Sequence, residues 1–183
     1  MKSKVFTNDL DNKCMANIFQ FFVINTPIKS LSNKSISVEE YGWKTPWKKG
    51  NLKDALKGVS KIPDLLYSAN NYKNMEDALI KANLFKNYKN SKVEKICIYD
   101  NKRNQTLSVF YHLRNGLAHG RYSIYGAKNI TNSYILLEDY YQERLSARIV
   151  LKISTLKNWI RIIKNKGNRK KIVTIDLEII NVK

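Results

Sequence analysis

Apolar residues recur at every third or fourth position along much of the chain, which is the spacing that lines one face of a helix. On this ground helices are predicted over residues 8–24, 52–59, 75–88, 105–119 and 155–163, with a shorter helical stretch over 63–67. From residue 27 to residue 50 the periodicity vanishes, and Trp43 and Trp47 are expected to pack under a long loop there. The pattern therefore predicts a chain built mainly from short helices.

Alternation of apolar and polar residues, which is typical of strands, is clearest after residue 120. It predicts a hairpin or meander from residues 121–125, 133–140 and 145–153, and an edge or added strand over 172–182. Residues 93–99 fit a helix and a strand equally well. No repeat and no internal boundary interrupts the sequence, so we expect one mainly α domain over residues 1–183, a helical bundle with a small antiparallel β element after helix 105–119.

The charge of the chain narrows the classes of partner. Its 183 residues include 33 Lys and Arg against 15 Asp and Glu, a formal net charge of +18. This surplus indicates a polyanionic partner, with nucleic acid ahead of a membrane surface, because no basic amphipathic helix stands out. No apolar run is long enough to span a bilayer and no signal peptide is apparent. Cys14 and Cys97 fit neither a disulfide framework nor a metal spacing, so we expect a cytoplasmic protein that holds no metal or other cofactor.

The residues suited to acid–base chemistry near neutral pH lie on one predicted helix. His112 and His119 are the only histidines of the chain. On an ideal helix they share a stripe with Ser108 and Asn115, because the spacings are four, three and four residues. This stripe is polar but uncharged, and the apolar residues that include Leu113 and Leu117 lie opposite it.

The end of this helix carries a longer string. Residues 114–122 read RNGLAHGRY, with a polar residue directly after Arg114, small or apolar residues up to His119, and a glycine beyond it. The string resembles the Arg-x4-His motif of the HEPN superfamily of ribonucleases and toxins. The resemblance covers about residues 105–165 and extends to the β segments and the helix that follow. It implies a HEPN-like helical bundle, a dimer joined near the motif helices, and cleavage of RNA without a metal.

The residue types of the motif suit this chemistry. Cleaving RNA without a metal requires a base for the ribose 2′-OH, an acid for the leaving 5′-oxygen and a cation beside the phosphorane. His119 can serve as acid or base, and the planar guanidinium of Arg114 matches two phosphate oxygens. Asn115 would orient one of them or bond across the dimer. The catalytic candidates are therefore Arg114, His119 and Asn115.

The helix itself raises a geometric difficulty, because five residues place Arg114 and His119 about 140° apart around its axis. Three arrangements could bring them to one phosphate: Arg114 reaches around the helix, Gly116 and Gly120 loosen its last turn, or a two-fold dimer joins two motifs in one cleft. The structural alternative for Arg114 is an ion pair with Glu138 or Asp139.

Further residues are candidates for contact with RNA or for regulation. The RNA-binding candidates are His112, Arg121, Arg161, Lys164, Lys166, Arg169, Lys170 and Lys171. For His112 a structural or interface role is the favoured alternative, and the basic run after residue 160 can equally be a solvated turn. Some toxins of the HEPN superfamily carry a tyrosine two residues after the histidine that a partner nucleotidyltransferase modifies. Here Arg121 holds that position, and Tyr122 follows as the candidate for modification by such an antitoxin.

The favoured hypothesis is a metal-independent endoribonuclease that acts on RNA as a homodimer, in the role of a toxin or antiviral effector. Three alternatives stay open: a HEPN-like module that binds RNA without cutting it, a subunit that binds a small nucleotide or a partner through the same face, and a basic DNA-binding regulator. A nuclease requires His119, whereas a binding module tolerates its loss. A DNA-binding regulator would prefer duplex DNA, and no helix-turn-helix is recognisable in the sequence.

Overall fold

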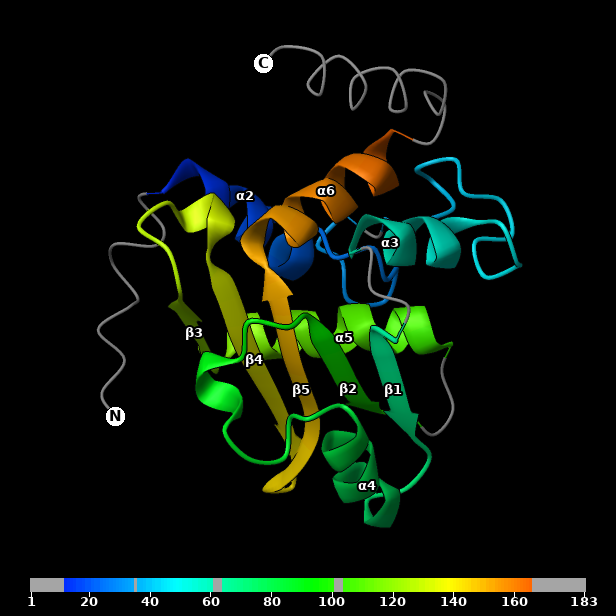
Figure 1. Ribbon diagram of the computed structural model, residues 1–183. Coiled ribbons are helices and arrows are strands. Elements are labelled where there is room, and N and C mark those ends of the chain that lie inside the picture. Colours follow the sequence, from blue (N-terminus) through cyan, green and yellow to red (C-terminus); the bar gives the residue numbers. More distant parts are fainter. Residues whose placement is uncertain (1–11, 35, 61–63, 101–103, 166–183) are drawn as a thin grey trace.

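A five-stranded sheet forms the centre of the molecule (Figure 1). The computed structural model describes residues 12–34, 36–60, 64–100 and 104–165. Its strands are β1 (Leu66–Ala69), β2 (Lys95–Tyr99), β3 (Tyr122–Tyr125), β4 (Tyr134–Tyr141) and β5 (Arg144–Lys152). They lie in the order β1-β2-β5-β4-β3. Because β1 and β2 are parallel and the other neighbours antiparallel, the sheet is mixed.

Helices cover both faces of the sheet and one of its ends (Figure 1). The α-helices are α2 (Lys13–Phe19), α3 (Leu52–Ser60), α4 (Lys73–Lys81), α5 (Gln105–Ala118) and α6 (Ile153–Lys164). Three shorter helical segments are η1 (Gln20–Ile24), η2 (Tyr88–Asn90) and η3 (Ile130–Asn132). Helix α5 crosses one face, α4 packs against β1 and β2 on the other, and α2, α3 and α6 gather at one end.

The prediction of a mainly helical bundle with a small β element is wrong, because the sheet is the central layer. The reason lies in its pairing. Strand β2 pairs with β5, about fifty residues further along the chain, and β1 joins β2 in parallel across helix α4. Local periodicity records neither partner. The helical stretch predicted over 63–67 is also wrong at its end, where β1 begins, and the ambiguous residues 93–99 contain β2.

The predictions around the motif are confirmed. Helix α5 and strands β3, β4 and β5 lie within one or two residues of the expected bounds. The helix predicted from residue 8 is described from Lys13, where the side chain of Asn12 caps it, and it widens into a π-helix at Gln20. Trp43 is buried under the long loop, and its indole N–H donates to the carbonyl of Ile163. The strand predicted over 172–182 lies outside the described residues.

The two faces of the sheet contribute to separate apolar clusters, because alternate residues of each strand point to opposite sides. On the α5 side, Ile135, Leu137 and Ile149 join the main core with Phe110 and Leu113 of the helix. The α4 side holds a smaller cluster that includes Leu79, Cys97, Leu136 and Val150. Helix α5 is therefore fixed against the sheet over most of its length, which holds the motif in place.

Gly116 allows the closest approach between the motif helix and the sheet. A Cβ atom at this position would overlap the side chain of Leu137 and lie 3.0 Å from the carbonyl oxygen of Glu138. Gly116→Ala is therefore expected to lower the free energy of unfolding by about 1–3 kcal/mol, because α5 must move away from β4. Urea denaturation measures this loss.

Gly58 in α3 supplies the matched control, since a Cβ atom there has no neighbour within 4 Å. Gly58→Ala is expected to raise the free energy of unfolding by about 0.5–1 kcal/mol, because alanine loses less backbone entropy in a helix than glycine does. Equal effects of the two substitutions would contradict the close packing of α5 on β4.

Candidate active site

The motif occupies the last turns of α5. The side chain of Asn104 caps the first turn by accepting from the N–H of Thr106 at 2.9 Å. At the other end His119 is the C-cap residue, and its peptide N–H donates to the carbonyl of Asn115 at 2.9 Å. Gly120 follows with a φ of +64°, a conformation that ends the helix and turns the chain toward β3. The helix is regular up to this turn, so it fixes the directions of the motif side chains.

A buried carboxylate on β4 connects the polar residues of α5. Asp139 has 3% of its surface exposed. Its Oδ2 atom lies 2.8 Å from Nδ1 of His112 and accepts from the amide of Asn115 at 3.2 Å. Its Oδ1 atom accepts from the peptide N–H of Tyr140 at 2.9 Å. Two of these three hydrogen bonds, those with His112 and Asn115, join the motif helix to the sheet, and the third lies within β4.

His112 lies inside this network and not on the surface. It has 5% of its surface exposed, and its Nε2 atom lies 3.1 Å from the carbonyl oxygen of Tyr99 on β2. The carboxylate of Asp139 and the carbonyl of Tyr99 can only accept, so both ring nitrogens of His112 face acceptors. The polar stripe is thus divided. Ser108, bonded to Asp100, and His112 are buried against the chain's own strands, and only the end around Asn115 and His119 lies near solvent.

Arg114 is half-buried beside Asn115. Its Nη1 atom donates to Oδ1 of Asn115 at 3.2 Å, and its Nε atom is buried without a hydrogen-bond partner in the structure. The ion pair considered for Arg114 is not found among the described residues. Glu138 pairs instead with Arg148 at 2.6 Å, and Asp139 with His112. Arg114 therefore reaches Asp139 only through the amide of Asn115.

His119 and Arg121 are exposed polar side chains at the carboxyl end of the helix. The guanidinium of Arg121 lies over the ring of Tyr140, 5.4 Å from its centroid, and the Tyr140 hydroxyl donates to Glu138 at 3.0 Å. Burial, followed by the nearby charge of Glu138, raises the pKa of Tyr140 above its ordinary value. The phenol therefore stays protonated at neutral pH and keeps this hydrogen bond.

The remaining predicted residues are spread over the molecule. Tyr122 is 8% exposed, and its ring packs edge-on against Phe19 at 5.7 Å between centroids. Arg161 and Lys164 are exposed in the last turn of α6. The candidates that lie outside the described residues are Lys166, Arg169, Lys170 and Lys171. Within the described part of the chain no group of three or more His, Cys, Asp or Glu residues is placed to hold a metal ion, and no helix is long and apolar enough to cross a membrane.

Asp139 was not predicted as the centre of a hydrogen-bond network, although the sequence contains a signal for it. Ile135, Leu137 and Asp139 alternate on one face of β4, so a single carboxylate falls on the face that its neighbours bury. A buried carboxylate needs hydrogen-bond donors, and the polar side chains of α5, the helix that precedes β4 in the sequence, are the candidates for this role. The predicted partner of Asp139 was Arg114, whereas Asp139 binds His112 and Asn115.

The fold and the site together define a mixed α/β protein whose Arg-x4-His helix is anchored to the sheet by a buried aspartate. Residues 51–172, about two thirds of the chain, match the family HEPN pEK499 p136, and the chain therefore belongs to this HEPN family. The match includes every part of the motif and all five strands. Neither the curated proteins nor the solved structures contain a match.

Proposed function

We propose that this HEPN protein is a metal-independent endoribonuclease. The observation that supports the proposal most is the position of His119, which is exposed at the end of the motif. Within the motif, Asn115 donates to Asp139 of the sheet and accepts from Arg114. An exposed imidazole and a guanidinium in the same motif are suited to binding and cutting a flexible polyanion.

The proposed reaction uses the neighbouring ribose hydroxyl as the nucleophile. His119 removes the proton of the 2′-OH, the 2′-oxygen attacks phosphorus, and the bond from phosphorus to the 5′-oxygen breaks. An acid, His119 of the same or of a second copy, returns a proton to the leaving 5′-oxygen. Arg114 stabilises the negative phosphorane, and Asn115 positions Arg114 by accepting from its Nη1 atom. The products are a 2′,3′-cyclic phosphate and a free 5′-hydroxyl.

We place this reaction in a cleft between two copies of the chain. Arg114 and His119 leave the regular helix α5 about 140° apart, so one copy does not aim both at the same phosphate. Because His112 and Ser108 are buried within the chain, the part of the polar stripe that is left for a second copy is the end around Asn115 and His119. A two-fold axis near this end would bring Arg114 of one copy toward His119 of the other.

Mixing two inactive variants tests the shared cleft. If each site takes its arginine from one copy and its histidine from the other, a heterodimer of Arg114→Ala and His119→Ala retains one complete site. The mixture should then recover about a quarter of the wild-type rate after random exchange of subunits. Light scattering at micromolar concentration should report twice the chain mass of 21.3 kDa. No recovery on mixing, or a monomer at every concentration, would contradict a shared cleft.

The biological role we propose is that of a toxin or antiviral effector acting on RNA. The exposed Arg161 and Lys164, together with the basic residues that follow them in sequence, would contact the phosphate backbone without reading sequence. A nucleotidyltransferase-type antitoxin would have to reach Tyr122, whose ring packs against Phe19. We therefore propose the toxin role without modification of Tyr122.

A second candidate is a module that binds RNA or a protein partner without cleavage. It is favoured by one observation: Arg114 is half-buried and bonded to Asn115, so part of its guanidinium is already engaged. RNA and DNA oligonucleotides of the same sequence distinguish the two candidates. The nuclease cuts the RNA and spares the DNA, which lacks the 2′-OH, whereas the binding module leaves both intact.

A further inference from the structure

Tyr140 of β4 is an exposed aromatic residue next to the carboxylate that anchors the motif. It keeps 37% of its surface exposed, and its peptide N–H donates to Asp139, which also accepts from the amide of Asn115. Between Asp139 and Tyr140 the register of β4 with β5 shifts. Such β-bulges are common beside active sites, where they redirect a side chain. Tyr140 is therefore positioned by the same carboxylate that bonds to the motif helix.

The ring of Tyr140 is held on the face of the sheet away from α5. Leu137 and Asp139 face this helix, so the residue between them, Glu138, points to the other side. There Glu138 forms an ion pair with Arg148 and accepts from the hydroxyl of Tyr140 at 3.0 Å. Because this hydrogen bond orders the ring, little side-chain freedom is lost when a ligand binds to it.

Arg121 adds a cation to this ring. It follows His119 by two residues, and its peptide carbonyl accepts from the N–H of Glu138 at 2.9 Å, which fixes its backbone beside β4. Its exposed guanidinium lies over the ring of Tyr140, 5.4 Å from the centroid. Among the described residues Arg121 forms no ion pair with a carboxylate. The Tyr140–Arg121 pair therefore combines an exposed ring with a cation that is available to an anionic ligand.

We propose that the Tyr140–Arg121 pair stacks an unpaired base of the RNA strand that is bound at the motif. This inference rests on the proposed ribonuclease function and adds the class of substrate, which is single-stranded RNA. Aromatic rings and guanidinium planes are the groups on which proteins stack the splayed bases of single strands. The guanidinium can also bind a phosphate of the same strand. In a duplex the neighbouring base pairs cover the faces of each base, so a paired base does not reach the ring.

Binding of strands with and without bases tests the stacked base. The two probes are a fluorescent single-stranded 2′-O-methyl RNA, which has no free 2′-OH to start cleavage, and an abasic strand with the same number of phosphates. Tyr140→Ala should weaken binding of the intact probe by about 5–100-fold, the usual effect of losing one stacked base, and leave binding of the abasic probe unchanged. Tyr140→Phe keeps the ring and should bind both probes within about twofold of the wild type.

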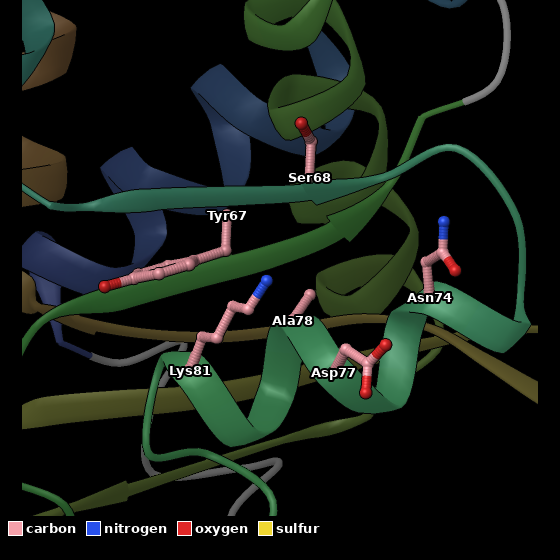
Figure 2. Close-up of a pocket in the computed structure, with 6 residues that line it drawn as sticks. All are labelled: Tyr67, Ser68, Asn74, Asp77, Ala78 and Lys81. Atoms are coloured by element: carbon pink, nitrogen blue, oxygen red, sulfur yellow. The ribbon is translucent and has the colours of Figure 1, made fainter.

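Two matched controls come from the region of α4. Phe85 is also 37% exposed, and the ammonium of Lys86 lies 6.0 Å from its centroid, so Phe85→Ala removes a similar ring away from the motif. Figure 2 shows Lys81 on α4, in a cavity of about 430 Å³ between α4 and β1. Arg121→Gln should weaken binding of the intact probe by about fivefold or more, whereas Phe85→Ala and Lys81→Gln should change it by less than about twofold.

The outcomes separate the stacked base from the ribonuclease. If Tyr140→Ala weakens binding of both probes equally, or of neither, the stacked base is overturned, even where His119→Ala abolishes cleavage of unmodified RNA. If Tyr140→Ala weakens binding of the intact probe alone and the wild-type protein cuts no RNA, the stacked base stands and the ribonuclease is rejected. Equal losses of affinity in Tyr140→Ala and Phe85→Ala would also overturn the proposal, because any exposed ring would then bind RNA.

Discussion

Replacing His119 by alanine is expected to slow RNA cleavage by about 10²–10⁴-fold, which is the usual contribution of a general acid or base. His119 is exposed at the end of α5, so the substitution removes no packed side chain. The free energy of unfolding should therefore change by less than about 0.5 kcal/mol. The rate is measured as kcat/KM on a labelled RNA, and stability by urea denaturation of the same preparation.

A control for this experiment is Glu76→Ala, which removes an exposed side chain from α4 on the other face of the sheet. It should leave the rate of cleavage unchanged. If His119→Ala cleaves RNA at the wild-type rate, His119 is not the acid or base. If the wild-type protein and the His119→Ala variant bind RNA equally and neither cleaves it, the protein is a binding module and not a nuclease.

Asp139→Ala is expected to have the largest effect on stability, a loss of about 2–5 kcal/mol in the free energy of unfolding. The substitution leaves three donors without their acceptor: Nδ1 of His112, the amide of Asn115 and the peptide N–H of Tyr140. His112 is almost fully buried, so water cannot replace the lost carboxylate without a cavity opening to it. The shift of the urea midpoint measures this loss.

The matched control is Asp77→Ala, which removes an exposed carboxylate from α4 and should change the free energy of unfolding by less than about 0.5 kcal/mol. Asp139→Asn gives an intermediate case, because an amide oxygen can still accept from one or two of the donors. An Asp139→Ala protein as stable as the wild type would mean that the network around His112 does not hold α5 against the sheet.

The sequence was most informative where structure is local. Helix α5 carries its own cap at Asn104 and a continuous apolar face, and β4 and β5 form a hairpin with clear alternation. Their prediction needed no knowledge of distant partners. Strand β1 has only four residues and is held as a strand by its pairing with β2. The residues of the segment alone therefore did not reveal that it is a strand and not a helix.

The sequence identified the residues of the motif, but it did not show which of them are buried and what they contact. The string from Arg114 to Tyr122 led to the HEPN family that the comparison supports. Helical spacing also placed Ser108, His112, Asn115 and His119 on one stripe, but it could not show that the first two are covered by strands of the same chain. That covering depends on the long-range pairing of β2 with the β4–β5 hairpin, which places both Tyr99 of β2 and Asp139 of β4 beside the helix.

The chemistry of the cleaved RNA end tests the proposed ribonuclease most directly. The wild-type protein is incubated with RNA in excess EDTA, and the 3′ ends of the products are identified by mass spectrometry. Attack by the neighbouring 2′-OH predicts undiminished cleavage and ends that carry a 2′,3′-cyclic phosphate or the monophosphate formed by its hydrolysis. Cleavage that requires added metal, or products that end in a 3′-hydroxyl, would contradict the roles assigned to Arg114 and His119.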